Sequence, residues 1–179
     1  RYTNWQNTTK RLVDEYIKDL ESKINNDVPS SKVSIYSELK IEWYKHYAHI
    51  IEHINDYLPA GYVDPYMVST VFDSVQNILP QAIKGIEVKA INSSTGDKLE
   101  YPRNSPKKII AVGGNRLSRG FTLEGLTINY FIRTANYSDA LLQMGRWFGY
   151  RPGYLDCCKI FTSQDTIDKF NSTTEDYNN

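Results

Sequence analysis

The chain has 179 residues, of which 40% are hydrophobic, and its 21 basic residues balance 21 acidic ones. That length suffices for one domain with a real core, or for one domain with a helical addition, and it excludes a large multidomain enzyme. No apolar run approaches the roughly 18 residues that a membrane span requires, so the sequence predicts a soluble protein without a membrane partner.

Charge is distributed unevenly between the two halves of the chain. Residues 1–102 hold 11 basic and 14 acidic residues, whereas residues 103–179 hold 10 basic and 7 acidic residues. Five basic residues precede the first acidic residue of the second half: Arg103, Lys107, Lys108, Arg116 and Arg119. Because no neighbour in sequence cancels their field, we expect either a solvated basic face or a contact with phosphate.

The only two cysteines, Cys157 and Cys158, are adjacent in sequence. Adjacent side chains in a strand point to opposite faces, so a disulfide between them is not expected. Reduced cysteines fit a reducing compartment, and the sequence therefore predicts a cytoplasmic location. The chain starts with Arg1 and not with Met, which we interpret as a segment of a longer polypeptide.

Residues 1–84 are predicted to be mostly helical. Apolar residues recur at every fourth position within residues 8–26, which predicts a first helix there. A second stripe, at about 100° per residue, predicts a helix over residues 37–57. A third helix is expected to begin where Asp64 and Pro65 supply an N-cap and a first-turn proline. Pro80 is expected to end it.

Residues 85–179 are predicted to contain strands as well as helices. Short β-branched runs, each bounded by Gly, Pro, Asn or Ser, predict strands over residues 85–92, 108–112, 126–132 and 157–161. A helix is expected over residues 138–150, and Ser163 can cap a final helix that runs through Phe170. This alternation predicts an α/β fold with a parallel sheet.

Ligands of such sheets bind beyond the carboxyl ends of the strands, so the loops after Val112 and Ile132 are where chemistry is expected. The first of these loops, Gly113 to Gly125, reads GGNRLSRGFTLEG. Glycines and arginines suit close approach to phosphate, although no Lys-Ser/Thr follows the glycines as in a P-loop. The alternative is an ordinary connection in which the glycines only turn the chain.

A second constellation, QMGRWFGYR, runs from Gln143 to Arg151 and holds two arginines. Guanidinium groups suit the charge that builds on phosphoryl oxygens as a γ-phosphate is cleaved, and such arginine fingers contribute about 10³ to 10⁵ in rate. The alternative is that Arg146 and Arg151 form surface ion pairs while the aromatic residues between them pack as core.

Together the two segments resemble superfamily 2 helicases. Asn115 to Thr122 occupies the place of the fifth motif of that superfamily, Ala-Arg-Gly-x-Asp after a strand, and Gln143 to Arg151 occupies the place of the sixth, Gln-x-x-Gly-Arg-x-x-Arg. The run from Gly113 to Phe161 is more closely similar to the Z1 domain family, whose members carry an endonuclease label and occur beside ATPase modules. The hallmark strings of that family, GGNxLSRGxTLEGL and QMGRWFGYRxGY, are present almost verbatim.

The resemblance implies a RecA-like (P-loop NTPase-like) fold, in which helices flank a parallel sheet. It implies that residues 85–179 form the C-terminal lobe of a helicase-type motor and that residues 1–84 form a helical region belonging partly to the same lobe. The implied function is ATP-dependent processing of nucleic acid, most simply DNA, in defence or repair. Neither Walker motif occurs in the chain, so ATP and Mg²⁺ would be bound mainly by a Walker-motif lobe upstream in the same polypeptide.

The resemblance also assigns individual residues. It implies arginine-finger roles for Arg146 and Arg151. Positions near the ATP ribose and phosphates are implied for Arg119, Gly120, Thr122, Glu124 and Gln143. Nucleic-acid contacts are implied for Asn92, Ser93, Arg116 and Ser118. Thr122 stands where the helicases have Asp, and four residues rather than two separate the arginines, so Arg146 fits the pattern better than Arg151.

Two other functions are compatible with the sequence. A nuclease needs an acidic residue and then Asp/Glu-x-Lys on a strand to hold Mg²⁺, a pattern that Asp73, Glu87 and Lys89 can supply. An interaction module that keeps the fold without the chemistry is the other. His46, His49 and His53 share one side of a predicted helix, but no Cys or carboxylate cluster completes a site, so no metal site is predicted.

Overall fold

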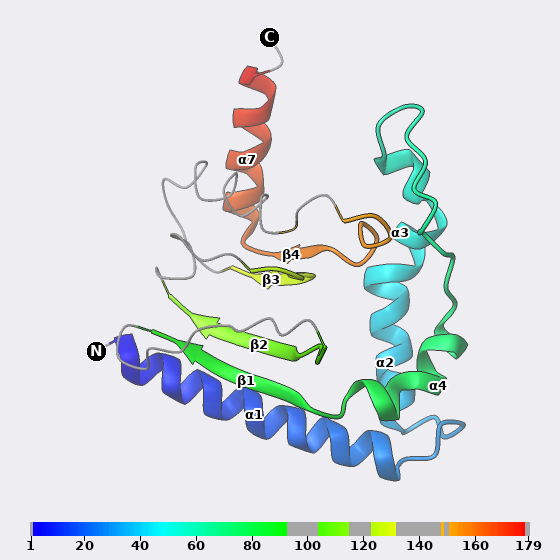
Figure 1. Cartoon of the computed structure of the whole chain (residues 1–179), viewed down its shortest axis with the longest axis vertical. Helices are drawn as coiled ribbons and strands as arrows, with labels where there is room; N and C mark the ends of the chain where they lie inside the picture. Colours follow the sequence, from blue (N-terminus) through cyan, green and yellow to red (C-terminus); the bar gives the residue numbers. More distant parts are fainter. Residues whose placement is uncertain (1, 93–103, 115–122, 132–147, 149–150, 178–179) are drawn as a thin grey trace. The chain divides into compact units, whose positions relative to one another are not determined.

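The computed structural model describes residues 2–92, 104–114, 123–131, 148 and 151–177 (Figure 1). The chain divides into two compact units. The N-terminal unit comprises Arg1–Val63 and Val68–Arg119, and the C-terminal unit comprises Asp64–Met67 and Gly120–Asn179. Within the described ranges, no helix combines the length and the apolar character needed to cross a membrane.

The longest element of the N-terminal unit is helix α1 (Tyr2–Asn26), six residues longer at its start than the sequence predicts. It runs alongside the first strand of the unit, as Figure 1 shows. Its inner side presents partly or fully buried apolar residues at helical spacing, Ile17, Leu20 and Ile24 among them. Its outer side carries three exposed ion pairs at i, i+4 spacing, of which Lys18–Asp14, 3.0 Å apart, is one. Such pairs stabilise a helix only slightly, so packing on the sheet holds α1 in place.

Ser34 is the N-cap of helix α2 (Ile35–Trp43). Its buried hydroxyl oxygen accepts the Ser37 N–H of the first turn. The helix predicted over residues 37–57 is correct in place but wrong in regularity. After α2 the chain continues as a π-helical turn η1 (Tyr44–Ala48), a short helix α3 (His49–Glu52) and a 3₁₀ turn η2 (Ile54–Tyr57). Around the π-helical turn, the Trp43 ring stacks on Tyr47, four residues later in the same helical stretch, with ring centroids 5.3 Å apart.

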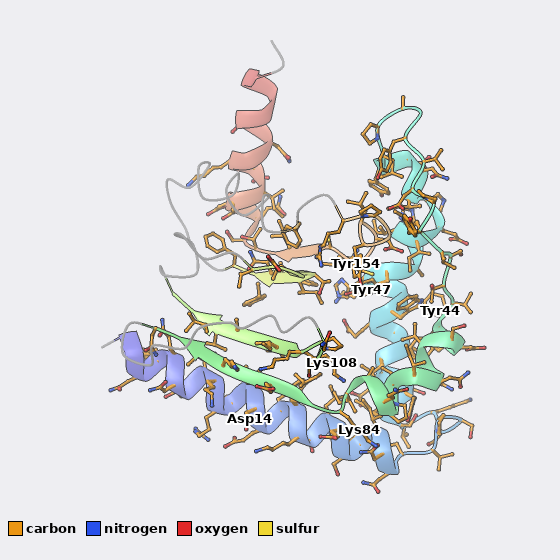
Figure 2. The ribbon with its side chains drawn as sticks, in the orientation of Figure 1. Asp14, Tyr44, Tyr47, Lys84, Lys108 and Tyr154 are labelled. Atoms are coloured by element: carbon orange, nitrogen blue, oxygen red, sulfur yellow. The ribbon has the colours of Figure 1, made fainter. Side chains whose placement is uncertain are left out.

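The prediction of a helix starting at Asp64 and ending before Pro80 is wrong at both ends. Residues 64–71 are not helical, and helix α4 (Phe72–Ala82) contains Pro80 in its last turn. A proline there removes only one hydrogen bond of the helix. The Lys108 side chain donates to the carbonyls of Gln81 and Ala82 at 3.3 and 2.7 Å and so satisfies the helix end; Figure 2 shows it there.

The apolar core of the N-terminal unit consists of Ile24, Ile35, Tyr36 and Ile83, all less than 9% exposed. It joins α1, α2 and the end of α4. The Tyr36 hydroxyl donates to the Ile24 carbonyl at 2.6 Å, so its polar end is satisfied inside the core. The sequence predicts a boundary between a helical region and a lobe after residue 84, directly after Ile83 of this core.

Strands β1 (Ile86–Ile91) and β2 (Lys108–Gly113) pair in parallel, from Ile86 opposite Lys108 to Ile91 opposite Gly113. Both strands lie where the sequence predicts them. The second half of β1 is buried, and Ile91 is 1% exposed. Because α1 packs against both strands, this sheet is covered on that face.

The C-terminal unit holds a second parallel pair, strands β3 (Ile128–Tyr130) and β4 (Lys159–Phe161), followed by helix α7 (Gln164–Tyr177). Both strands are shorter than predicted. Helix α7 starts directly after Ser163, as predicted, and is longer than predicted. The chain is therefore an α/β protein with small parallel sheets. The helix predicted over residues 138–150 lies outside the described residues, apart from Phe148, which is helical.

Candidate functional site

The carboxyl ends of β1 and β2 lie at the same edge of their sheet. Since Ile91 is opposite Gly113, the register places Asn92 beside the start of the glycine-rich loop. Asn92 is buried, with 6% of its surface exposed. Loops that follow parallel strands at one edge are the usual place for ligands in such sheets. The register therefore places Asn92 at the edge where ligands are expected, and its nucleic-acid role stays a prediction.

Sequence reasoning missed Gln6, which lies at this edge. The Gln6 Nε2 atom is only 2.9 Å from the position that a Cβ on Gly114 would occupy, so a glycine there leaves room for the carboxamide. The Gln6 Oε1 atom is buried and accepts no hydrogen bond from the described part of the chain. The signal in the sequence is weak: Gln6 lies seven residues before Val13 on the inner side of α1, a polar residue on an apolar stripe.

Arg151 is the member of the second constellation whose contacts are defined. Its guanidinium donates from Nη2 to the Leu126 carbonyl and from Nε to the Phe148 carbonyl, the latter at 3.3 Å. The Arg151 guanidinium carbon also lies 4.8 Å from the centroid of the Tyr154 ring, a cation–π contact. The Arg151 side chain is only partly exposed. These partners are all internal, which is the arrangement of a structural arginine.

The Arg151 contacts join the two segments that carry the family resemblance. Leu126 follows directly after the glycine-rich loop, whose last described residues, Glu124 and Gly125, form a turn closed by the Leu126 N–H and the Leu123 carbonyl at 3.3 Å. Gly125 has φ +84°, and a Cβ there would stand 3.6 Å from Arg151 Nη1. A positive φ favours glycine. Glu124, predicted to lie near the nucleotide, is exposed on this turn.

The remaining residues that the sequence selects lie outside the described ranges, and their predicted roles stay predictions. They are Ser93, Arg116, Ser118, Arg119, Gly120, Thr122, Gln143 and Arg146.

The two cysteines are free, as the sequence predicts. Desolvation of the Cys157 thiol and then the neighbouring Asp156 carboxylate raise the pKa of Cys157 to about 11, although the residue as a whole is exposed. Burial also raises the pKa of Cys158, against the opposing effect of the Arg151 and Lys159 charges. Burial lowers the pKa of Lys159, whose Nζ donates to the Asp156 carbonyl at 2.8 Å. Both thiols are therefore protonated at neutral pH, and a protonated thiol is a poor nucleophile and a poor metal ligand.

The residues proposed for a nuclease do not gather into a metal site. Lys89 Nζ lies 3.8 Å from Glu87 Oε2, so these two side chains of β1 pair with each other. Asp73 is exposed in the first turn of α4. Over the described residues, no group of three or more His, Cys, Asp and Glu side chains could hold a metal ion.

The three histidines have other contacts. His46 Nε2 lies 3.1 Å from Glu42 Oε2 one turn earlier, and the rings of His49 and His53 stack with centroids 4.4 Å apart. The His53 Nδ1 atom is also 3.0 Å from the His49 carbonyl oxygen. These contacts are local to one helical stretch.

Comparison with known proteins identifies the family. The family model described as the Z1 domain matches residues 1–179, the whole chain. Neither the comparison with curated proteins nor the comparison with solved structures gives a significant match. The match includes both hallmark segments, which Arg151 joins in the structure, and it extends to the N-terminal helices. The chain therefore belongs to the Z1 domain family.

Proposed function

We propose that this chain is the C-terminal, RecA-like lobe of a helicase-like protein that processes nucleic acid at the expense of ATP. In this proposal the chain supplies Arg146 to an ATP site that a Walker-motif lobe upstream in the same polypeptide completes. The parallel pairing of β1 with β2, and the packing of α1 on both, are the arrangement that a RecA-like sheet needs.

The observation that carries the proposal is the Arg151 bridge. A composite phosphate site needs the glycine-rich loop and the arginine-bearing segment close to each other. The hydrogen bond from Arg151 to the Leu126 carbonyl ties the end of the loop to the end of the arginine-bearing segment. Because the internal partners of Arg151 engage its guanidinium, Arg146 is the arginine of that segment assigned to phosphate. A guanidinium there stabilises the charge that develops on the transferred phosphoryl oxygens.

In this proposal the chain supplies one side of an ATP site. The sequence holds neither the lysine-bearing phosphate loop nor the acidic Mg²⁺ motif, so ATP and Mg²⁺ would be held mainly by the upstream lobe. When bound, the metal neutralises charge on the β- and γ-phosphates. From this chain, Arg119, Gly120 and Thr122 would approach the ribose and phosphates, with Glu124 and Gln143 beside them.

The nucleic-acid part of the proposal rests on charge and position. Residues 103–179 carry the net positive charge, and neutralising phosphates with basic side chains dominates affinity for nucleic acid. Asn92 lies at the carboxyl edge of β1, where Ser93 follows, and Arg116 and Ser118 belong to the neighbouring loop. We assign this track to DNA and the process to defence or repair in the cytoplasm.

The test uses the natural full-length polypeptide that contains this chain. Arg146→Ala should lower nucleic-acid-stimulated ATP hydrolysis by about 10³-fold or more, because it removes the arginine finger. ATP binding, followed with a fluorescent analogue, and the circular dichroism spectrum should not change. Arg11→Ala is the matched control, since Arg11 is exposed and, within the described part of the chain, pairs with Glu15 alone, on the outer side of α1.

Normal turnover in the Arg146→Ala variant would overturn the arginine-finger assignment. A parent protein with no nucleic-acid-stimulated ATP hydrolysis would overturn the motor proposal as a whole. Mg²⁺-dependent DNA cleavage that is lost in Lys89→Ala would support the nuclease function in its place.

A further inference from the structure

A short segment of the chain, Asp64–Met67, belongs to the C-terminal unit although the residues on both sides of it belong to the N-terminal unit. Its first residue, Asp64, is only 8% exposed. An ionised carboxylate is costly to bury unless hydrogen bonds compensate the lost water. The partners of Asp64 therefore show what this burial achieves.

Both Asp64 carboxylate oxygens accept backbone N–H groups. Oδ1 accepts the Tyr66 N–H at 2.9 Å, and Oδ2 accepts the Gly153 N–H at 2.5 Å. The Met67 N–H, 3.3 Å from the Asp64 carbonyl oxygen, closes the local turn. Hydrogen bonds to a charged acceptor are shorter and stronger than neutral ones. Asp64 thus holds its own turn with one oxygen and a turn 89 residues away in sequence with the other.

Gly153 is suited to this contact in two ways. Its φ is +80°, a conformation that residues with a side chain rarely adopt. A Cβ at this position would stand 3.0 Å from the Tyr66 carbonyl oxygen and 3.1 Å from the Tyr66 Cβ, so any side chain would push the segment away. The glycine therefore permits the close approach that the Asp64 hydrogen bond requires.

The turn that Asp64 holds also carries Arg151. The Tyr154 N–H donates to the Arg151 carbonyl at 3.3 Å, so residues 151–154 form one turn with Gly153 inside it. The Arg151 guanidinium leaves this turn to reach the Leu126 carbonyl and the Tyr154 ring. The backbone orientation at Gly153 therefore sets where the guanidinium can go.

We infer that Asp64 is a positioning residue, a carboxylate that fixes the 151–154 turn and through it the Arg151 bridge. Its consequence for catalysis rests on the proposed function: the turn follows the segment that carries Arg146, so loosening it would misplace that arginine. The sequence does not indicate this role, because the helical pattern of residues 64–79 predicts that Asp64 is a helix N-cap.

The first experiment measures the turn itself and does not depend on ATP hydrolysis. In Asp64→Asn the carboxamide oxygen can still accept the Tyr66 N–H, whereas its NH₂ group cannot accept the Gly153 N–H. Hydrogen–deuterium exchange of the peptide over residues 151–154 should speed up roughly tenfold, the loss expected when a hydrogen bond to a charged group is removed. Asp56→Asn, at an exposed position of η2, is the control and should leave that exchange unchanged.

Gly153→Ala disrupts the same contact at the Gly153 end. It also provides a second variant in case Asp64→Asn misfolds. If Asp64 acts through Gly153, the double variant Asp64→Asn/Gly153→Ala should exchange no faster than the Gly153→Ala single variant. Additive effects in the double variant, or normal protection of the turn in Asp64→Asn, would overturn the inference.

The second experiment is kinetic and uses the full-length protein. Asp64→Asn should lower kcat for nucleic-acid-stimulated ATP hydrolysis roughly 10- to 100-fold, the range expected for a small misplacement of a catalytic group, with KM for ATP unchanged. An effect confined to KM would overturn the inferred effect on catalysis. A normal kcat in a variant whose 151–154 turn exchanges faster would overturn it too. If the parent hydrolyses no ATP but Asp64→Asn exposes the turn, the proposed function fails and the Asp64 assignment stands.

Discussion

The two parallel strand pairs of this protein have similar apolar sequences but different surroundings. In the N-terminal unit, Val88, Ala90 and Ile91 of β1 are 1–7% exposed. In the C-terminal unit, Ile128 of β3 and Ile160 of β4 are 49% and 45% exposed. The first pair has α1 packed along it, whereas no described helix of the C-terminal unit packs comparably on the second.

The units therefore differ in what holds them together. The N-terminal unit is stabilised by apolar burial around Ile24, Ile35, Tyr36 and Ile83. The described part of the C-terminal unit is organised by side chains that bind backbone groups, Arg151 at Leu126 and Asp64 at Gly153. Burial is non-directional, whereas these hydrogen bonds specify the conformation of turns. Substitutions should accordingly act on global stability in the first unit and on local geometry in the second.

The largest effect is expected in the apolar core. Ile24→Ala removes a side chain that is 3% exposed and should lower the free energy of unfolding by about 3 kcal/mol, through lost burial and the cavity left behind. Urea denaturation followed by circular dichroism measures it. Leu12→Ala on the same helix, at a 53% exposed position, is the control. Equal losses of stability in the two variants would mean that apolar burial around Ile24 is not what stabilises this unit.

Alkylation of Cys157 measures how far its local surroundings in the C-terminal unit disfavour the thiolate. Because its pKa is raised to about 11, its thiolate fraction should still increase about tenfold per pH unit from pH 8 to pH 10, where a cysteine with the ordinary value of 9.0 begins to level off. The rate of alkylation by iodoacetamide in a Cys158→Ser background should follow this increase. Asp156→Asn should shift the curve to lower pH. Levelling near pH 9 in the parent would contradict the assigned environment.

Substitution of Arg151 distinguishes a structural role of this arginine from a catalytic one. Arg151→Ala should lower the free energy of unfolding by about 2 kcal/mol, because it removes charged, partly buried hydrogen bonds to two carbonyl groups. Arg151→Lys keeps the charge but not the planar fork and should restore only part of that loss. Thermal and urea denaturation of the three proteins give the comparison. A fully stable Arg151→Ala variant that no longer hydrolyses ATP would instead make Arg151 an arginine finger.

The smallest effect tests a polar contact inside the apolar core. Tyr36→Phe keeps the ring and removes the hydroxyl that donates to the Ile24 carbonyl at 2.6 Å, so the free energy of unfolding should fall by about 1 kcal/mol. Tyr16→Phe, at a 64% exposed position of α1, should have no effect in the same urea titration. A loss as large as that of Ile24→Ala would show that hydrogen bonding also dominates this unit.

Much of the local structure could be predicted from the sequence. The four-residue spacing of Leu12, Tyr16, Leu20 and Ile24 predicts α1, and β-branched runs bounded by breakers predict β1 and β2. The helix is confirmed, but the predicted apolar stripe is only half right: Leu20 and Ile24 pack in the core, whereas Leu12 and Tyr16 are 53% and 64% exposed. The non-helical segment at Asp64 could not be predicted, since its hydrogen bond to Gly153 is a contact with no periodic signature. The π-helical turn after Trp43 could not be predicted either, because apolar spacing over one turn does not distinguish π-helical from α-helical geometry.

The candidate site divides in the same way. Motif spacing selects the glycine-rich loop and the arginine-bearing segment, and it favours Arg146 over Arg151 as the arginine finger, but it does not say what Arg151 contacts. The structure gives Arg151 internal partners at Leu126, Phe148 and Tyr154. Gln6 beside Gly114 could not be selected by motif either, because the two are brought together only by the packing of α1 on the sheet.

The sequence by itself determined the family, the α/β character, the places of the main helices and strands, and the two segments that carry the resemblance, because each is written in local residue order. Tertiary structure decided which groups Asp64, Gly153 and Arg151 contact. Their hydrogen bonds join positions 25 and 89 residues apart, and the preference of a carboxylate or a guanidinium for one backbone group depends on which groups folding brings within about 3 Å of it.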